Sequence, residues 1–355
     1  MTGVQTCALP ISFLRNVVNN APFLRSALSK FAPEDAVKLL NSNGCKTKVE
    51  RGRRAFPQSD KASDVTKALH RYATANNADI RLFHEIREIV PDNNGFTIKF
   101  IGGKEKFDRV IMCTGGMSYS STGSDGSSYE FIKSMGHNVV TPVPSLVALY
   151  TKEDLSSAEG LTLKNVSVCA DGVKPIFGDM MITDSGVSGP VILTLSAYTA
   201  RRSYPFAIRI DLKPAMTVEE LDNRLLRDFG EQKNKQFKNS LDMLLPKSII
   251  QFIIKKSDIS KDRQVNSITK QERRKLAESI KSFELTVTGN AGFDHAVVTS
   301  GGVDVKQVNP KTMESRLVRG LYFGGEVLDV DALTGGYNFH IALATGYVAG
   351  SSASV

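Results

Sequence analysis

The first third of the chain carries two helical patterns followed by a series of strand-like runs. One helix is expected to begin at Pro33 and to end at Gly44, because proline favours the first helical position and glycine the position after the last. Another is expected after Ser63-Asp64, where apolar side chains recur at helical spacing. Three strands follow, with a β-meander between the first and the last, in the segments IRLFHEIREIV, GFTIKFIGG and FDRVIMCTGG. This order is typical of the second half of a nucleotide-binding α/β domain.

The pattern changes near residue 144 and returns near residue 296. The strand-like runs LTLKNVSVCA and YPFAIRIDL precede a lysine-rich helical region from Val218 to Lys281, which Pro246 and the polar residues 257–266 interrupt. From Ala296 the segments AVVTSGGV and LYFGGEV again resemble buried strands, and TGGYNF opens a closing helix. We therefore expect an α/β protein whose main domain is split between residues 12–143 and 296–355, with strands and helices inserted at residues 144–295.

Residues 1–11, MTGVQTCALPI, have no periodicity, no helix cap and no βαβ pattern. They resemble translated sequencing-adapter sequence. We expect a non-native leader that lies outside the core.

Composition is that of an ordinary globular protein. Hydrophobic residues make up 41% and charged residues 23% of the 355 residues. No apolar run is long enough to cross a bilayer, and no signal peptide opens the chain. The cysteines Cys7, Cys45, Cys113 and Cys169 are far apart and form no CxxC pair, which argues against a disulfide framework or a zinc site. These features predict a cytoplasmic protein without a membrane or metal partner.

The net charge of +8 is concentrated in one segment. Between Lys213 and Lys281 there are 16 basic and 10 acidic side chains. This excess is either a solvated helical surface or a contact for nucleic acid. Because the basic residues are interleaved with acids and few aromatic residues accompany them, the solvated surface is favoured and nucleic acid is an unlikely partner.

Two places where a strand runs into glycines carry the candidate chemistry. The first is VIMCTGG, which ends in Cys113-Thr114-Gly115-Gly116. Glycines at the carboxyl end of a strand allow the backbone to approach a ligand, since ligands of open α/β sheets bind at that end. An ordinary tight turn explains this first segment equally well.

The second place is longer and more specific. The strand LYF leads to Gly325-Glu326, and a short loop leads to Gly335-Gly336-Tyr337-Asn338-Phe339 at the start of a helix. Free N–H groups and the dipole at a helix N-terminus favour a ligand that carries or develops negative charge. In a flavoenzyme that position suits the N1/O2 edge of the isoalloxazine ring.

Four stretches of the sequence resemble the HI0933-like flavoprotein family, which includes aminoacetone oxidase-type and bile-acid-reductase-type proteins. They are VERGRRAFPQSDKASDV, VIMCTGGMSYSSTGS, LTVTGNAGFDHAVVTSGGV and NPKTMESRLVRGLYFGGEVLDVDALTGGYN. The resemblance extends from about residue 19 to residue 350. It implies an FAD domain of the two-dinucleotide-binding-domain type, split in sequence, with a β-barrel-like and helical insertion.

The resemblance also assigns roles to residues. It implies that Glu326 contacts the ribityl and phosphate region of FAD, and that the backbones of Asn338 and Phe339 meet the flavin ring. It places Thr114 and Gly115 at a second flavin-contacting strand end and Ile86 beside the adenine. Together with the residues chosen from pattern, the predicted cofactor site consists of Ile86, Cys113, Thr114, Gly115, Gly116, Gly325, Glu326, Gly335, Gly336, Tyr337, Asn338 and Phe339.

The sequence departs from the family pattern at its beginning. Such proteins open with a strand, a GxGxxG turn and a helix, and continue with a glycine-rich GGGRCN-type loop; only Asn19-Asn20 resembles a remnant of that loop. Ala332-Leu333 and Ser127-Ser128 also differ from the residues expected there. We therefore expect a truncated FAD domain that lacks a helix N-terminus for the pyrophosphate.

The expected activity is that of an FAD-dependent oxidoreductase. It would transfer hydride between flavin and either a nicotinamide, NAD(P)H being a possible donor, or a small organic substrate. The alternatives are a flavin-dependent nucleic-acid-binding or RNA-modifying protein and an inactive fragment. No catalytic acid or base can be assigned, because His295 and His340 are as readily packing or surface residues. The polar segment Arg51–Asp64 could line the pocket or cap the next helix.

Overall fold

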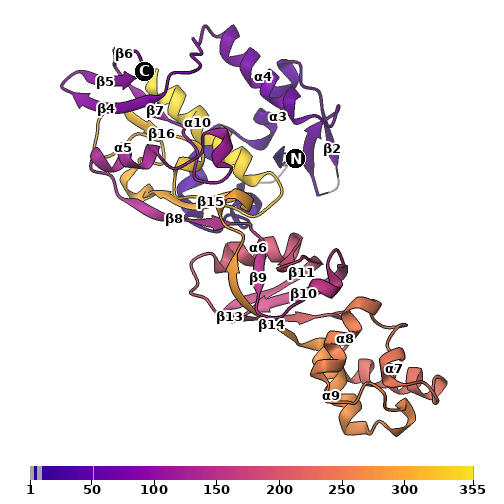
Figure 1. The fold of residues 1–355 in the computed structure, drawn as a ribbon. Helices are drawn as coiled ribbons and strands as arrows, with labels where there is room; N and C mark the ends of the chain where they lie inside the picture. The colour runs from indigo at the N-terminus through magenta and orange to yellow at the C-terminus, as the bar shows by residue number, and fades with distance from the viewer. Residues whose placement is uncertain (1–3, 6–9, 51, 355) are drawn as a thin grey trace. The chain divides into compact units, whose positions relative to one another are not determined.

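The computed structural model describes residues 4–5, 10–50 and 52–354 and divides them into two compact units (Figure 1). The first unit ends at Ser145 and resumes at Gly292, and the second extends from Leu146 to Ala291. The sequence-based boundaries had been placed at residues 144 and 296. Each unit has its own hydrophobic core.

The first unit is an α/β unit with several small sheets. Its helices are α1 (Pro10–Leu14), α2 (Arg25–Lys30), α3 (Pro33–Ser42), α4 (Ala62–Ala75), α5 (Ser128–Ser134) and α10 (Tyr337–Ala353). Its strands are β1 (Val4–Gln5), β2 (Thr47–Glu50), β3 (Arg54–Pro57), β4 (Ile86–Asp92), β5 (Gly95–Phe100), β6 (Gly103–Phe107), β7 (Val110–Met112), β8 (Val139–Ser145), β15 (Val298–Val303) and β16 (Leu321–Phe323). The sheets have the orders β1-β3-β2, β4-β5-β6, β15-β8 and β16-β7.

Helix α10 is the central helix of this unit. Its sequence, YNFHIALATGYVAGSSA, is apolar on most sides, as expected for a helix that is covered all round. It contacts β16, β7, α2 and α3, and Figure 1 shows it next to β7 and β16. The expected closing helix is therefore present, and it joins segments from both ends of the sequence into one core.

The second unit contains a closed barrel of six strands in the order β10-β11-β12-β9-β14-β13. The strands are β9 (Leu149–Thr151), β10 (Thr162–Ala170), β11 (Val173–Ile182), β12 (Gly186–Ser188), β13 (Phe206–Asp211) and β14 (Phe283–Asn290), with helix α6 (Pro190–Thr199) between β12 and β13. All neighbouring strands are antiparallel. Closure leaves no sheet edge exposed, and it confirms the expected barrel in the insertion.

Three helices connect β13 to β14, as the lysine-rich pattern predicts. They are α7 (Val218–Glu231), α8 (Lys247–Lys256) and α9 (Lys270–Lys281). Thr217 and Thr269 cap α7 and α9 through reciprocal bonds with Glu220 and Glu272, the capping box of a helix N-terminus. Pro246 immediately precedes α8, because proline is tolerated only at the beginning of a helix.

Three local expectations need correction. The first strand begins at Ile86 rather than Ile80, because Phe83 adopts a left-handed φ of 60° that a strand cannot continue. The run FDRVIM is divided between β6 and β7. Ser63-Asp64 does not cap α4, whose N-cap is Lys61; Asp64 instead accepts a hydrogen bond of 2.6 Å from Ser59 Oγ.

The expected leader is partly described. Val4 and Gln5 pair with β3, and Pro10 and Ile11 begin α1; the position of this leader outside the core stays a prediction. Residues 1–3 and 6–9, including Cys7 and Leu9, lie outside the described residues. Among the described helices, none is long and apolar enough to cross a membrane.

Candidate functional site

The carboxyl ends of two parallel strands lie side by side in the first unit. Strand β7 pairs with β16 so that Val110 is opposite Leu321 and Met112 opposite Phe323. The pairing extends by one bond of 3.0 Å from Gly324 N to Met112 O. The two glycine-containing turns expected from the sequence therefore leave the sheet at the same edge, which is where ligands of open α/β sheets bind.

Glycines in these turns are required by packing within the protein. A Cβ atom at Gly324 would lie 3.0 Å from Gly346 Cα and 3.1 Å from Cys113 Sγ. A Cβ atom at Gly116 would lie 2.4 Å from Thr299 Oγ1. Real Cβ atoms essentially never approach another atom as closely as 2.4 Å, and few of them approach to 3.0–3.1 Å. The glycines thus allow α10 and β15 to approach the strand ends, and their presence alone does not show that a ligand approaches.

Glu326 lies in the short 3₁₀ helix Gly325–Val327 that follows β16. Its Oε1 accepts a hydrogen bond of 2.6 Å from Thr299 N. Burial raises the pKa of this carboxyl, the bonds from Thr299 oppose the rise, and Asp331 adds to it. A Cβ atom on Gly116 would lie 3.1 Å from Glu326 Oε1. The structure therefore brings together Gly116 and Glu326, two of the predicted residues.

A second carboxylate, the buried Asp331, was not predicted. It is 1% exposed and accepts hydrogen bonds from Asn19 Nδ2 at 2.5 Å, Ser300 Oγ at 3.0 Å and Ser145 Oγ at 3.3 Å. Burial raises its pKa, and these donors oppose the rise. Asp331 fixes the loop before α10 to three distant segments. The acids of LDVDALTGG next to the glycine pair are the only sequence signal for it.

The N-terminus of α10 has no side-chain cap. Gly335 and Gly336 have φ values of 121° and 91°, which other residues rarely adopt. The Asn338 side chain holds the preceding loop, since its Oδ1 accepts from Ala332 N at 2.8 Å and its Nδ2 donates to Ala332 O at 2.7 Å. The Asn338 amide is therefore engaged within the protein, and only its backbone remains for the contact that was expected. First-turn N–H groups have no partner within the helix itself.

One buried polar atom near this site lacks a protein partner. The hydroxyl of Tyr129, on α5, is buried and makes no hydrogen bond among the described residues. Burial and the nearby carboxylates of Glu326 and Asp329 raise its pKa, so the hydroxyl stays protonated and can donate. An orphaned buried donor is costly unless a ligand or water satisfies it. The site thus contains a polar position that a bound group would complete.

The other predicted residues fall in different places. Thr114 Oγ1 donates to Ser128 Oγ at 2.7 Å, which joins the end of β7 to the start of α5. Tyr337 is buried and packs edge-on against Phe13. Ile86 begins β4, in a different sheet from β7 and β16. The remaining predicted positions flank these contacts: Cys113, Gly115, Gly325 and Phe339.

The contacts of His295 and His340 do not support a role for either side chain as a catalytic acid. His340 is fully buried, and its Nε2 lies 3.1 Å from Phe31 O. Burial lowers the pKa of His340 to about 4. His295 is exposed in the 3₁₀ helix Phe293–His295. Among the described residues no group of three His, Cys, Asp or Glu side chains could hold a metal ion.

Comparison with known proteins identifies relatives along nearly the whole chain. The model of the HI0933-like protein Rossmann domain matches residues 4–352. A 3-dehydro-bile acid delta(4,6)-reductase from Clostridium scindens is 31% identical, with 94% of this chain and 83% of the relative covered. A ribosomal RNA dihydrouridine synthase from Haemophilus influenzae is also 31% identical with the same coverage. The ribosomal RNA dihydrouridine synthase of Escherichia coli is 28% identical over 91% of this chain and 80% of the relative.

Proposed function

The chain belongs to the HI0933-like Rossmann-domain family, and we propose that it is an FAD-dependent oxidoreductase. One arrangement supports this above all others. The carboxyl ends of β7 and β16, the half-buried Glu326 and the uncapped N-terminus of α10 belong to one compact unit. The carboxyl ends of parallel strands are where α/β sheets bind dinucleotides. A helix N-terminus stabilises the part of a flavin that becomes negative on reduction.

The residues fit FAD by the chemistry of their donors and acceptors. The Glu326 carboxylate would accept hydrogen bonds from the ribityl hydroxyls, and the first-turn N–H groups of α10 would point to the N1/O2 edge of the ring. The orphaned Tyr129 hydroxyl would donate to a polar group of the cofactor. Bound FAD supplies hydride transfer to or from an organic substrate or a nicotinamide.

The relatives' names favour a particular class of reaction. A Δ4,6-reductase of a 3-dehydro-bile acid and a dihydrouridine synthase each saturate a carbon–carbon double bond. In both substrates that double bond is conjugated to a carbonyl group, which makes its far carbon electrophilic. We therefore propose that this chain also reduces a carbonyl-activated double bond, with reduced nicotinamide as the electron donor.

A second candidate is reduction of a base within RNA. Two of the relatives are named ribosomal RNA dihydrouridine synthase, and the segment Lys213–Lys281 carries a net positive charge. A large anionic substrate would be held by basic residues away from the chemistry. This candidate and a small organic substrate share the flavin site and differ in what the second unit binds.

The flavin site can be tested by replacing Glu326. Glu326→Ala removes a charge-assisted acceptor, and we expect the affinity for FAD to fall about 10- to 150-fold, equivalent to about 1.5–3 kcal/mol. Glu326→Gln keeps one acceptor oxygen and should retain more affinity. Exposed Glu159→Ala serves as the control. The measurement is flavin absorbance of purified protein and titration of the stripped protein with FAD, with a thermal melt in the absence of FAD.

The same experiment includes Gly336→Val, which needs a folding check. The φ of 91° at Gly336 makes any side chain there strained, so this substitution can lower stability as well as FAD affinity. The Glu326 variants are therefore the ones that test whether this is the flavin site. If Glu326→Ala folds and binds FAD as tightly as wild type, this carboxylate does not belong to a flavin site. If the wild-type chain takes up no flavin at all, the oxidoreductase proposal fails.

A further inference from the structure

Five lysines converge on one cavity in the helical part of the second unit. The cavity has a volume of about 660 Å³ and is lined by Lys235, Lys238, Lys247, Lys255 and Lys261, which we call the lysine cleft. Asp242 is the only acidic side chain that lines it. The five lysines are exposed. Like charges gathered in one concave place raise its positive potential and attract anions.

Among the residues that the structure describes, four of these five lysines have no ion-pair partner. Lys238 pairs with Asp262 at 2.7 Å. For the other four lysines, no ion pair or side-chain hydrogen bond occurs within the described part of the chain. Unpaired ammonium groups that face the same cavity repel one another until an anion enters it.

Three acidic side chains of the helical region pair with arginines rather than with lysines. Asp222 pairs with Arg273 at 2.7 Å, Asp228 with Arg224 at 2.7 Å, and Glu272 with Arg263 at 2.6 Å. These pairs lie between and within the helices α7 and α9 and the loop that joins α8 to α9. These three acids are therefore engaged by arginines and do not neutralise the lysines that line the cleft.

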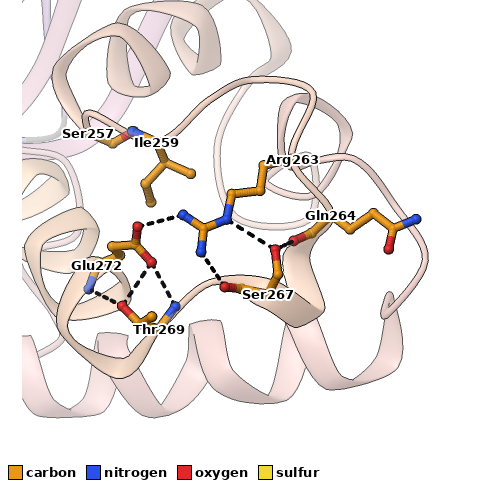
Figure 2. A network of polar contacts seen from close by, with 7 residues as sticks. All are labelled: Ser257, Ile259, Arg263, Gln264, Ser267, Thr269 and Glu272. Carbon is orange, nitrogen blue, oxygen red and sulfur yellow. Dashed lines mark hydrogen bonds and ion pairs between the residues drawn. The ribbon is translucent and has the colours of Figure 1, made fainter.

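The loop between α8 and α9, which carries Lys261, is held by a network of polar contacts around Arg263. Arg263 donates through Nη1 to Glu272 Oε1 and through Nε to Ser267 Oγ at 3.0 Å (Figure 2). Glu272 also accepts from Thr269 N at 2.8 Å. The bond from Thr269 N, together with the Arg263 guanidinium, lowers the pKa of Glu272 to about 2, so the network stays charged.

Backbone bonds fix the two lysine-bearing segments to each other. Phe237 N donates to Arg263 O at 2.8 Å, and Lys238 N donates to Lys261 O at 2.9 Å. The network around Arg263 thus positions Lys261 opposite Lys238. These bonds fix the backbones that carry Lys238 and Lys261, while the side chains themselves are exposed.

We propose that the lysine cleft binds phosphate groups of an RNA backbone. This inference rests on the RNA candidate above and gives it a docking surface. Lysine is a flexible point charge that suits phosphate without reading sequence. No aromatic side chain lines the cleft, so stacking on unpaired bases is not expected. The ligand is therefore the backbone of structured RNA, recognised largely independently of sequence.

The test compares two matched pairs of substitutions in the full chain. Lys247→Gln with Lys255→Gln removes two charges from the cleft. Lys164→Gln with Lys174→Gln removes two exposed charges from the barrel strands β10 and β11. Lys247→Arg with Lys255→Arg keeps the charge. Binding of a labelled RNA hairpin of about 16 base pairs is followed by fluorescence anisotropy from about 50 to 200 mM KCl.

We expect only the cleft glutamine pair to weaken binding. Each phosphate contact contributes about 0.9 to the slope of log K against log salt, so the slope should fall by about 1.8. Affinity near 0.1 M salt should fall about 10- to 100-fold, by the same counterion release. The arginine pair and the barrel pair should bind as wild type does.

Three results would overturn the proposal. The first is equal weakening by the barrel pair, which would show a diffuse charge effect. The second is displacement of RNA by inorganic phosphate or AMP at matched phosphate concentration, which would show a pocket for free phosphate. The third is equally strong displacement by polyglutamate of matched charge, which would favour an acidic protein. Flavin content of the same preparations tests the oxidoreductase proposal separately, because RNA binding here does not depend on flavin.

Discussion

His340 was a candidate catalytic acid from its place in the sequence, but its contacts are those of a packing residue. It lies on α10 two residues after Asn338, but its ring points into the core, stacked on Phe31 at 5.9 Å and edge-on to Phe13 at 5.5 Å. Burial outweighs the Phe31 carbonyl and Asp35 and lowers its pKa to about 4. At neutral pH it is an uncharged packing residue.

The lowered pKa of His340 makes folding stability depend on pH. The unfolded histidine has a pKa near 6.5, so between about pH 6.5 and pH 4 the unfolded chain binds a proton that the folded chain does not. The free energy of unfolding contributed by this group therefore falls as pH falls through that window, by about 3 kcal/mol in total. The measurement is urea unfolding at several pH values for wild type and His340→Gln, which can still donate to Phe31 O.

Comparing wild type with His340→Gln separates the pH dependence due to His340 from that due to the buried or half-buried carboxylates. Glu326 and Asp331 have raised pKa values, so they add stability as pH falls and act in the opposite direction. The difference between wild type and His340→Gln cancels their contribution. Exposed His295→Gln is the matched control. A wild-type profile that parallels that of His340→Gln would mean that the buried ring is not the source.

At the scale of the element, α10 depends on glycines that face its neighbours. Gly324, after β16, has an extended φ of −149° that any residue adopts, but a Cβ there would lie 3.0 Å from Gly346 Cα on α10. Gly350, on the same helix, has open space around its position. Substitutions at these two glycines therefore distinguish the effect of close packing on stability from the effect of backbone freedom.

Substituting alanine at each glycine should change stability in opposite directions. Gly324→Ala forces α10 away from β16 and should cost about 1–3 kcal/mol by overpacking. Gly350→Ala adds helix propensity without a clash and should stabilise the protein by about 0.5–1 kcal/mol. Urea denaturation measures both, and FAD titration should show loss of affinity only for Gly324→Ala. Equal stability of the two variants would show that the approach of α10 to β16 is not tight.

Element types were predictable where local signals agreed with the fold. The helices α3, α4, α7, α8 and α9 have start signals or a clear apolar stripe. Strand β11 and helix α6 were not identified. Pro175 and Gly178 interrupt the alternation of β11. Helix α6, PVILTLSAYT, is mostly apolar without a polar stripe, so periodicity cannot distinguish it from a buried strand.

The candidate site was predictable only in part, for a similar reason. Glycine turns after strands are visible in the sequence, and they identified the ends of β7 and β16. Asp331 and Thr299 were missed because their roles depend on long-range contacts, Thr299 with Glu326 and Asp331 with Asn19. Tyr129 was missed because only the fold shows that its hydroxyl is buried without a hydrogen-bond partner among the described residues. No local pattern encodes such contacts.

At the scale of the whole molecule, the two units have separate hydrophobic cores. Leu321, on β16, belongs to the core of the first unit, and Leu285, on β14, to the core of the second; each side chain is fully buried. The chain passes between the units after Ser145 and again after Ala291. Separate cores allow local unfolding of one unit without loss of the other.

Leucine-to-alanine substitutions in the two cores should therefore act on different segments. Leu285→Ala and Leu321→Ala each remove the same buried volume, and each should cost about 2–5 kcal/mol. Hydrogen exchange followed by mass spectrometry reports the effect for every segment. With Leu285→Ala, exchange should accelerate between Leu146 and Ala291 and stay unchanged in α10, and FAD binding should be retained. With Leu321→Ala the acceleration should be in the α/β unit and FAD binding should weaken, while the barrel is unaffected. Acceleration throughout both units by either variant would show that the chain unfolds as one cooperative body, and the lysine cleft could then no longer be studied apart from the flavin site.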